Sequence, residues 1–556
     1  MRKEETQIKP YSWLNKESKE ILYNGYIRND ITVQERVEEI SKYIAEEVLG
    51  KKELTQKFIN VIANGWCSLS SPIWSNIATE KGFGISCFNT HVPNTLPGIN
   101  ESLSEVSMQT KMGGGTSGYF GELYPAGTSL SSGAKSSGAI SFIKWFELIT
   151  QTVMQNGTRR GYFAGYLDID HPEIEEFLKI KDRTNDIQDI NTGVVIPDGW
   201  MEEMINGDKD KRNLWAKVLG SRREKGVPYI FFKDNANRNK PQVYIDKNLT
   251  INSSNLCSEI MLPSKEDESF VCCLLSMNLE KYDEWKDTDA VYTMTWFLDG
   301  VMEDFIRKVK DVPQMYRNYN FAKRHRALGL GALGWHSYLQ SKGVPFEGLE
   351  AQRYNNEIFK HIQEESLRAS KDLAKEYGEP EVMKGTGLRN STNVALAPTT
   401  TSSAILGQVS PGIEPYFSNY YRVTLAKGSY MRKNKHLEKL LEEKGKNTDE
   451  VWESIRIKQG SVQHLDFLSA REKEVFKTFR EISPVTVIQQ ASARQKYIDQ
   501  GQSLNLLISN ELPIKELNKL HIDAWKLGLK SLYYQRGIST SKEKALELMD
   551  CVSCSA

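Results

Sequence analysis

Helix-like and strand-like patterns alternate along most of this chain, and that alternation restricts its possible folds. Apolar residues recur at helical spacing over 36–49 and 142–154, whereas short runs rich in β-branched and aromatic residues occupy 193–197, 229–232 and 393–397. Alternating helices and strands are typical of an architecture in which helices cover a mostly parallel sheet. We therefore expect an α/β fold.

Positive and negative residues balance, with 72 Lys and Arg against 72 Asp and Glu and a formal net charge of +0. A balanced chain is not expected to bind nucleic acid or an anionic membrane through bulk electrostatics. No apolar run approaches the ~18 residues that a membrane-spanning helix requires. The charged start, Met-Arg-Lys-Glu-Glu, does not resemble a signal peptide. We expect a globular protein of the cytoplasm, with no nucleic-acid or membrane partner.

The seven cysteines are too sparse, and odd in number, for a secreted disulfide scaffold. The one C-x-x-C motif has no second pair or spaced histidines beside it, so we expect no zinc or other metal site. That motif, Cys551 and Cys554, lies at the very C-terminus, where chains are usually loose and solvated. Two thiols on such a tail indicate a redox shuttle that works by thiol–disulfide exchange.

The segment Asn255-Leu-Cys257-Ser-Glu259 places an amide, a thiol and a carboxylate at alternate positions. In extended backbone all three side chains point to one face. The amide can bind a hydroxyl, the carboxylate can accept a proton, and the thiol can act as a nucleophile or, once oxidised, abstract a hydrogen atom. Spacing alone does not choose between these roles, and an ordinary strand with a buried cysteine has the same pattern.

Two further thiols, Cys87 and Cys272, favour reductive chemistry. A thiol pair facing a third reactive thiol supplies two electrons and ends as a disulfide, which the tail pair could reduce. Thiol proteolysis needs a Cys–His pair, and only His91 lies close in sequence to any of these three cysteines.

A match to the dinucleotide motif G-x-G-x-x-G occurs at Gly329–Gly334. The residues before it, Phe-Ala-Lys-Arg-His-Arg, form no buried strand, although the nucleotide-binding motif requires one. We expect these glycines to serve close helix packing instead.

From Leu69 to the C-terminus the chain resembles the large catalytic subunit of class I ribonucleoside-diphosphate reductases. The segments that carry the resemblance are Ser71-Pro-Ile, Ser86-Cys87, Asn255-Leu-Cys-Ser-Glu-Ile, Cys272 with Asn278-Leu, Arg326-Ala-Leu-Gly-Leu-Gly, Ala397-Pro-Thr-Thr-Thr-Ser-Ser, Leu532-Tyr-Tyr-Gln and the terminal Cys pair. The resemblance implies a ten-stranded α/β barrel with a central finger loop over residues 69–535. A short helical N-terminal region, 1–68, would precede it, and a flexible tail, 536–556, would follow. Many relatives carry a further N-terminal ATP-cone, and we expect none here.

The implied activity is reduction of ribonucleoside diphosphates to 2′-deoxyribonucleoside diphosphates for DNA precursor synthesis. Cys257 would become a thiyl radical that takes the ribose 3′ hydrogen, Glu259 would accept the 3′-hydroxyl proton, and Asn255 would hold the ribose hydroxyls. Cys87 and Cys272 would deliver the reducing equivalents, and Cys551 with Cys554 would restore them. A shift of one residue would put Cys273 in place of Cys272.

Substrate phosphates would bind a hydroxyl-rich run, which alone could equally be a plain helix cap or loop. The residues implied for the substrate are Pro398, Thr399, Thr400, Thr401 and Ser402, together with Ser71, Ser86 and Gly115. Some family members carry Glu or Gly at the position of Thr400, so the exact phosphate contacts stay open.

The radical would come from a cofactor in a separate small subunit and reach Cys257 through Tyr533 and Tyr534. The dipeptide itself is weak evidence, since Tyr420-Tyr421 is another. The main alternative is an adenosylcobalamin-dependent reductase, against which the tyrosine pair argues. A catalytically silent nucleotide-binding subunit and a protein thiol–disulfide oxidoreductase are further alternatives.

The resemblance also implies regulation and partners. A nucleoside triphosphate, either a dNTP or ATP, would bind near a homodimer interface. The polar segment 181–191 is the candidate specificity loop, with Asp182 and Arg183 as contacts, and Asn94 stands where relatives often carry an acidic effector residue. Thioredoxin or a glutaredoxin-type protein would be the external reductant.

Overall fold

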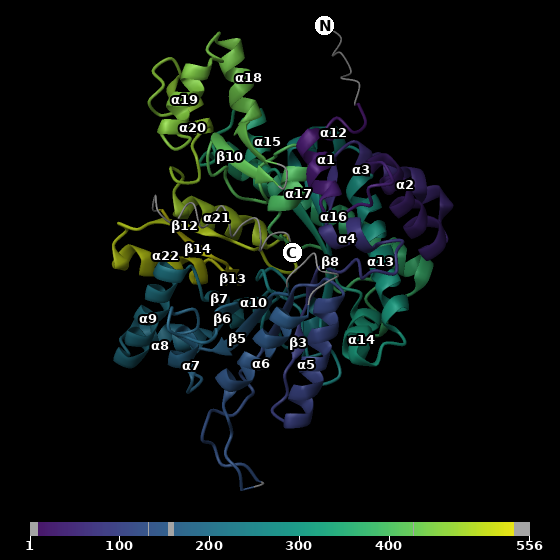
Figure 1. Cartoon of the computed structure of the whole chain (residues 1–556), viewed down its shortest axis with the longest axis vertical. Helices are drawn as coiled ribbons and strands as arrows, with labels where there is room; N and C mark the ends of the chain where they lie inside the picture. Colours follow the sequence, from purple (N-terminus) through teal and green to yellow (C-terminus); the bar gives the residue numbers. More distant parts are fainter. Residues whose placement is uncertain (1–8, 132, 154–160, 426–427, 539–556) are drawn as a thin grey trace.

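The computed structural model describes residues 9–131, 133–153, 161–425 and 428–538 (Figure 1). The first of its two parallel half-sheets uses five extended segments in spatial succession. They are β2 with β3 (Cys87–Phe88 and Thr90–His91), β4 (Thr116–Tyr119), β5 (Phe163–Asp168), β6 (Ile190–Ile196) and β7 (Tyr229–Phe232).

The second half-sheet is also parallel and also has five segments. They are β8 (Val271–Asn278), β9 (Leu328–Leu333), the bridged stretch 394–396, the stretch 502–509 that contains β12 (Leu506–Ser509), and the stretch 531–538 that contains β13 (Ser531–Leu532) and β14 (Gln535–Ile538). The run 393–397, expected to be a strand, thus contributes bridges to both of its neighbours.

Two antiparallel seams join the half-sheets into a ring. At one seam β2 pairs with β8, and at the other β13 pairs with β7. Within the described residues the pairings therefore trace ten extended segments around a closed α/β barrel, as the motifs predicted. Strands β5 to β9 are buried along almost their whole length, which is typical of parallel strands covered by helices.

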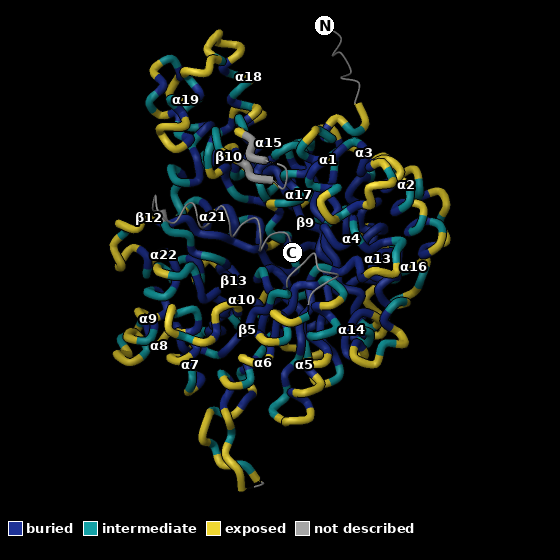
Figure 2. The backbone as a smooth tube through the Cα atoms, in the orientation of Figure 1, coloured by how far each residue is buried: buried dark blue, intermediate teal, exposed yellow. Residues whose placement is uncertain are grey.

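Helices cover the outside of the barrel (Figure 1), and Figure 2 shows the barrel interior as buried backbone. Those around the first half-sheet are α5 (Leu96–Lys111), α6 (Ala139–Thr152), α7 (Ile174–Leu178), α8 (Asp198–Asn206), α9 (Lys209–Lys225), α10 (Lys233–Arg238) and α11 (Gln242–Asp246). Those associated with the second are η3 (Leu279–Lys281), α12 (Tyr282–Trp285), α13 (Ala290–Val309), η4 (Pro313–Met315), α14 (Tyr316–His325), α15 (Trp335–Ser341), α16 (Leu349–Tyr377), η5 (Glu381–Met383), α17 (Thr400–Ile405), α21 (Pro484–Gln495) and α22 (Ile514–Lys526). In the described residues no helix is long and apolar enough to cross a membrane.

The N-terminal region is helical. It contains α1 (Lys16–Tyr23), α2 (Val33–Lys42), the π-helix η1 (Tyr43–Val48), η2 (Lys52–Leu54) and α3 (Thr55–Ala63), before β1 (Cys67–Leu69) and α4 (Ser71–Asn76). The helix expected over 36–49 begins earlier, because Thr32 and Glu35 form a reciprocal capping box. Strand β1 pairs antiparallel with β8, which attaches this region to the barrel.

A small unit projects from the barrel beside α15 (Figure 1). It contains β10 (Tyr420–Leu425), β11 (Gly428–Lys433), α18 (Lys435–Glu443), α19 (Asp449–Ile457) and α20 (Ala470–Val475). An apolar cluster of its own holds it together, including Leu437, Leu441 and Trp452. The charged stretch 433–447 contains α18, and the charged stretch 470–482 is α-helical only as far as Val475, in α20.

The expectation of helix packing at Gly329–Gly334 is wrong, because this stretch is mainly barrel strand β9. Its glycines allow close approach between strands. A Cβ at Gly329 would lie 2.3 Å from Leu274 Cδ2 and 3.1 Å from Cys272 Sγ. A side chain here would therefore displace Leu274 and crowd Cys272, one of the predicted redox cysteines.

Candidate active site

A loop between α11 and β8 carries Asn255, Cys257 and Glu259 into the barrel. The expectation of extended backbone across these residues is wrong. Ser258 N donates to Asn255 O at 3.3 Å, and Ser258 has a φ of +67°, so the segment turns sharply at its tip. The Asn255 side chain closes the turn, because its Oδ1 accepts from Glu259 N at 3.0 Å and from Ile260 N at 3.1 Å. An Asx-type turn of this kind competes with regular strand pairing.

Three buried hydroxyl groups from the barrel wall hold the backbone of this loop. They are Tyr166 Oη to Asn255 O at 2.7 Å, Ser503 Oγ to Cys257 O at 2.6 Å, and Ser531 Oγ to Ser258 O at 2.7 Å. Tyr166 lies in the first half-sheet, and the two serines lie in the second. The loop is therefore tied to both halves of the barrel, as expected of a central finger loop.

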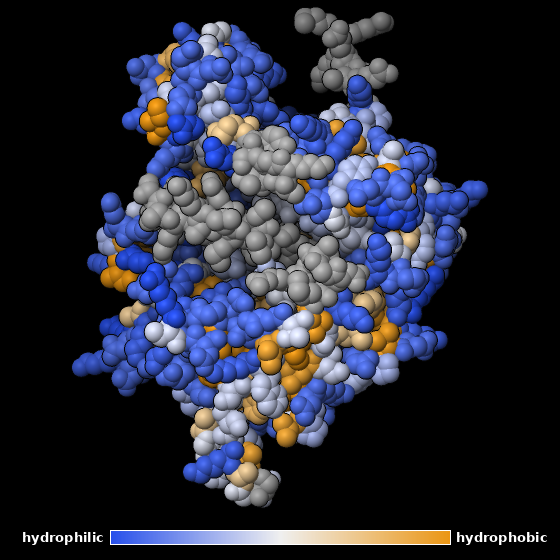
Figure 3. Space-filling view, viewed as in Figure 1, coloured by the Kyte–Doolittle hydropathy of each residue, from blue (hydrophilic) through white to orange (hydrophobic). Residues whose placement is uncertain are grey.

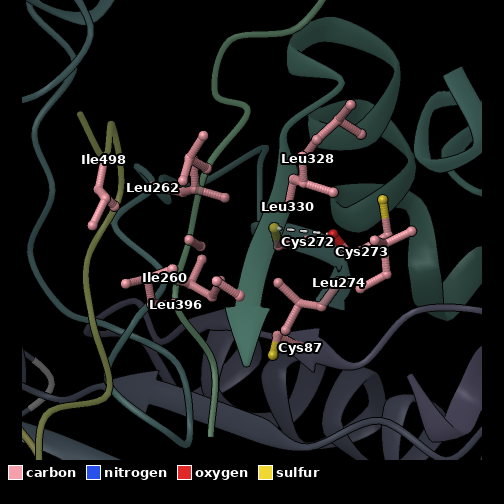
Figure 4. Close-up of a cluster of buried hydrophobic side chains, with 14 of the residues drawn as sticks. Cys87, Ile260, Leu262, Cys272, Cys273, Leu274, Leu328, Leu330, Leu396 and Ile498 are labelled. Carbon is pink, nitrogen blue, oxygen red and sulfur yellow. Dashed lines mark hydrogen bonds between the residues drawn. The ribbon is translucent and has the colours of Figure 1, made fainter. Parts of the chain in front are cut away.

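Cys87 and Cys272 are direct partners in the antiparallel register of β2 and β8. Opposed residues of such strands have Cα atoms about 4.5–5.5 Å apart, which is within the range that a disulfide spans. The neighbouring Cys273 points to the other side of β8, where its thiol contacts Leu298 O on α13 at 3.4 Å (Figure 4). The register thus favours Cys272 over Cys273 as the partner of Cys87.

The thiol of Cys87 joins this pair to the finger loop. Asn255 Nδ2 donates to Cys87 Sγ at 3.1 Å, and Cys87 Sγ lies 3.7 Å from Glu259 Oε1. Behind it, Gln500 Nε2 lies 3.4 Å from Cys272 Sγ. Burial raises the pKa of both the Cys87 and the Cys272 thiols well above their usual range. Neutral thiols suit hydrogen donation better than nucleophilic attack, which requires a thiolate.

Glu259 is buried, and its second carboxylate oxygen, Oε2, lies 2.9 Å from Ser503 Oγ. Burial raises the pKa of Glu259 to about 7, against the smaller lowering effect of the hydrogen bonds from Ser503 and its neighbours. A carboxyl group with such a pKa exchanges a proton readily near neutral pH.

A cavity opens beside these groups. Its wall includes Cys87, Cys257 and Glu259, together with most of the predicted substrate residues, namely Ser71, Ser86, Gly115, Pro398, Thr399, Thr401 and Ser402. Thr400 is exposed and does not line it. Asn255 lies behind the wall with its amide engaged by the loop and Cys87.

Two serine hydroxyl groups in the cavity wall are available for hydrogen bonding to a ligand. Among the described residues, the buried hydroxyls of Ser70 and Ser86 have no hydrogen-bond partner. Buried polar groups are normally satisfied, so unpartnered hydroxyls in a cavity wall are typical of a site for a polar ligand. The sequence interpretation had not singled out Ser70, nor Ser68 and Ser276, which also line the cavity.

Tyr533 and Tyr534 pack together beside the loop. Their ring centroids are 4.4 Å apart, and Tyr229 on β7 lies 4.7 Å from the first and 5.1 Å from the second. Leu256 belongs to the same apolar cluster and Cys257 packs against it, so the tyrosines and the loop cysteine share one cluster. Tyr229 was predicted only as the first residue of a strand, because a tyrosine in an apolar run carries no local sign of redox chemistry.

The predicted effector residues lie away from the cavity. Asn94 accepts a hydrogen bond from Tyr124 N at 3.2 Å, Asp182 forms an ion pair with Lys225, and Arg183 is exposed. Cys551 and Cys554 lie outside the described residues. Within the described part of the chain, no group of three or more acidic, His or Cys side chains could hold a metal ion.

The barrel matches a known family. The family model described as "Ribonucleotide reductase, barrel domain" matches residues 85–211, 208–386 and 380–535. The chain therefore belongs to the ribonucleotide reductase family and is an oxidoreductase. Within that family it is of the large, catalytic subunit type, as the motifs predicted.

Two curated relatives and one solved structure illustrate this. The chain is 33% identical to the ribonucleoside-diphosphate reductase large subunit of Invertebrate iridescent virus 3, over 93% of this chain and 92% of that protein. It is 29% identical to the large subunit of Danio rerio, over 86% of this chain and 69% of that protein. The Actinobacillus ureae class Id ribonucleotide reductase alpha subunit shares 50% identity with a TM-score of 0.91, covering 95% of this chain and 98% of that one. These relatives give no support to the cobalamin alternative.

Proposed function

We propose that this chain reduces ribonucleoside diphosphates to 2′-deoxyribonucleoside diphosphates with Cys257 as a transient thiyl radical. The main support for the proposal is that three chemical groups with different functions line one cavity wall. The loop thiol, a carboxyl group with a pKa near neutrality and the first member of an opposed thiol pair all border the same space.

The roles follow from what each group touches. Cys257 takes the 3′ hydrogen atom of the ribose, and Glu259 accepts the 3′-hydroxyl proton and returns it to the 3′ oxygen before the product leaves. Cys87 and Cys272 supply two hydrogens and two electrons as the 2′-hydroxyl leaves as water, and the two thiols become one disulfide. Cys257 then returns the hydrogen atom to C3′, so it is regenerated in each turnover. One hydrogen of the Asn255 amide is donated to the Cys87 thiol and orients it. The second amide hydrogen is proposed to bind a ribose hydroxyl.

The hydroxyl-lined part of the cavity is proposed to bind the diphosphate. Ser70 and Ser86 offer unpartnered hydroxyls there, and Thr399, Thr401 and Ser402 border the same space. Hydroxyl and backbone N–H groups donate hydrogen bonds to phosphate oxygens. We propose no direct contact for Thr400.

The radical is proposed to arise on a cofactor in a small partner subunit and to pass through Tyr534 and Tyr533 to Cys257. Ring separations of 4.4–5.1 Å among Tyr229, Tyr533 and Tyr534 support a short transfer path. After turnover, the Cys551–Cys554 pair of the tail re-reduces the internal disulfide, and thioredoxin or a glutaredoxin-type protein re-reduces the tail.

A homodimer is proposed across α5 and α6. Figure 3 shows an apolar area over these helices. Leu96 on α5, Trp145 and Leu148 on α6, and Tyr124 between the two helices are 42–62% exposed. Exposed apolar patches of this kind often mark protein interfaces. Asn94 contacts Tyr124 at the edge of the patch, which supports a nucleoside triphosphate effector site beside the interface, with Asp182 and Arg183 on the adjoining specificity loop. We place the enzyme in the cytoplasm.

Reconstitution tests the function. The purified chain, a radical-loaded small subunit of this family, CDP, an effector triphosphate and dithiothreitol should together yield dCDP. Cys257→Ser should abolish the product even with dithiothreitol. Cys273→Ser is the matched control, because this buried thiol faces α13 and not the cavity, and it should retain most turnover. An active Cys257→Ser enzyme would refute the proposal.

A further inference from the structure

Ser503 touches two parts of the active site that differ in chemistry. Its hydroxyl lies 2.6 Å from the backbone oxygen of Cys257 and 2.9 Å from Glu259 Oε2. Both the serine and the glutamate are almost fully buried, at 4% and 1% exposure. We propose that Ser503 is a positioning residue that couples the protonation state of Glu259 to the backbone carrying Cys257. The inference rests on the function proposed above.

The coupling follows from the number of protons available. A serine hydroxyl has one hydrogen to donate. When Glu259 is ionised, its carboxylate and the Cys257 carbonyl are both acceptors, so they compete for that hydrogen. A buried acceptor left without a partner is costly, and the Cys257 carbonyl is therefore held only part of the time.

Protonation of Glu259 removes the competition. The protonated carboxyl group has its own hydrogen, which it donates to Ser503 Oγ, and the serine hydrogen is then free for the Cys257 carbonyl. A chain of two hydrogen bonds replaces one shared donor. The Cys257–Ser258 peptide is consequently held most firmly when Glu259 carries the proton taken from the substrate. In that same state Cys257 carries the hydrogen atom that it must return to the ribose.

Glu259 is the group of this cluster that titrates near neutral pH. The ionisable groups that face it are Cys87 on β2, Cys272 on β8, Tyr166 on β5 and Cys257 of its own loop. Burial raises the pKa of Cys87, Cys272 and Tyr166 far enough to keep them neutral at pH 7.

A further pair of buried titratable residues, Lys530 and Asp499, lies close in sequence to Ser531 and Ser503. Lys530 Nζ donates to Asp499 O at 2.7 Å, and burial brings the pKa of Lys530 to about 7 and that of Asp499 to about 6. Among the described residues neither member of this pair is hydrogen-bonded to Ser503, and the titration of the pair is common to every variant compared below.

Ser531 provides a matched control. Its hydroxyl donates to Ser258 O at 2.7 Å, so it holds the adjacent peptide of the same loop, and it is equally buried at 3% exposure. Its hydrogen bond goes to a backbone oxygen and not to the Glu259 carboxylate. Loss of Ser531 therefore loosens the loop without changing the donor to Glu259.

The first experiment compares pH profiles of kcat for the complete enzyme with its small subunit, CDP and dithiothreitol. In Ser503→Ala the pKa of Glu259 rises because a donor to its charged form is lost, so the acid limb should move to higher pH by about 0.5–1 unit, the equivalent of one ordinary hydrogen bond. KM for CDP should change less than about twofold, since Ser503 lies outside the cavity wall. Ser503→Thr should restore the wild-type midpoint, whereas Ser531→Ala should lower kcat without moving it.

The inference is overturned if Ser503→Ala keeps the wild-type midpoint, or if Ser531→Ala shifts the midpoint equally. These outcomes differ from failure of the proposed function, in which the wild-type enzyme itself makes no dCDP.

A second measurement needs no variant of Ser503. Infrared difference spectra of the wild-type chain, labelled with ¹³C at cysteine carbonyls, are recorded across pH. The carboxyl band is assigned with Glu259→Gln, and the Cys257 carbonyl band with Cys257→Ser. The two bands should titrate with one midpoint, and a Cys257 carbonyl that ignores the ionisation of Glu259 would contradict the coupling.

Discussion

Cys87 and Cys272 stand directly opposite each other across β2 and β8, at one of the two antiparallel seams of the barrel. Their side chains therefore share a face, while Cys273 points outward to α13. Opposed residues of antiparallel strands have Cα separations within the range that a disulfide spans. It also places the proposed reductant next to the carboxyl group of Glu259.

A single turnover without external reductant should join these two cysteines. We expect the double variant Cys551→Ser, Cys554→Ser, whose tail cannot re-reduce the site, to form about one dCDP per active site and a Cys87–Cys272 disulfide, detected by peptide mass mapping under non-reducing conditions. Cys272→Ser should give no such cross-link and no multiple turnover. Cys273→Ser should form the cross-link normally, and a Cys87–Cys273 peptide would show that the register assignment is wrong.

The aromatic group should be required for the partner-generated radical. Tyr533→Phe and Tyr534→Phe remove the oxidisable hydroxyl but keep the ring, so each should reduce turnover by at least about 100-fold with little loss of stability. Tyr229→Phe tests the residue that sequence reasoning missed, and we expect a smaller loss. Steady-state dCDP formation measures the effect.

Tyr244→Phe is the control for the tyrosine variants. Tyr244 is buried and bonds Ser391 Oγ at 2.8 Å, away from the cluster of Tyr229, Tyr533 and Tyr534. Full activity of Tyr533→Phe would remove this residue from the transfer path.

Because the pKa of Glu259 is raised, an increase in pH through the range 4.5 to 7 should increase the activity and decrease the stability of the folded state. As a base it must be ionised, so kcat should fall about tenfold per pH unit below its pKa of about 7. The folded state keeps the proton up to about that pH, whereas the unfolded chain releases it near 4.5. The folded state therefore binds more protons between these values, and its stability decreases as pH rises through them.

Glu259→Gln should separate the two effects. Gln carries no charge to bury, so the variant should be inactive, yet more stable than the wild type at pH 8 by roughly 1–3 kcal/mol. Urea unfolding at pH 5 and pH 8 measures the difference, which should shrink at the lower pH. A variant equally destabilised at both values would indicate lost packing instead.

The tail cysteines should matter for only one kind of reductant. The double variant Cys551→Ser, Cys554→Ser should lose thioredoxin-driven turnover and retain most dithiothreitol-driven turnover, because a small thiol reaches the internal disulfide directly. If the double variant works as well with thioredoxin as the wild type does, the shuttle assignment fails.

The strands and helices were largely accessible to sequence reasoning. The run 229–232 coincides with β7, and 142–154 overlaps α6, because apolar periodicity reports which face of an element is buried. The ends were less accessible. The start of α2 depends on a capping box at Thr32 and Glu35, which lies before the apolar stripe begins.

The site was predictable where chemistry and motif coincide in one short segment. Asn255, Cys257 and Glu259 were predicted in this way, and they lie on one loop whose backbone turns instead of extending. Ser503 and Tyr229 were missed, because their importance comes from neighbours more than 200 positions away in the sequence. Long-range contacts of that kind leave no periodicity and no spacing to detect.

The three hydroxyls that hold the finger loop come from both half-sheets, Tyr166 from one and Ser503 and Ser531 from the other. The geometry of the loop therefore depends on the spacing between the two half-sheets of the barrel. A substitution at the seam of β7 and β13 that spreads the halves slightly would misplace Cys257 while the barrel remains folded. Catalysis in such a molecule is lost before stability is, although the substituted residue does not meet the substrate.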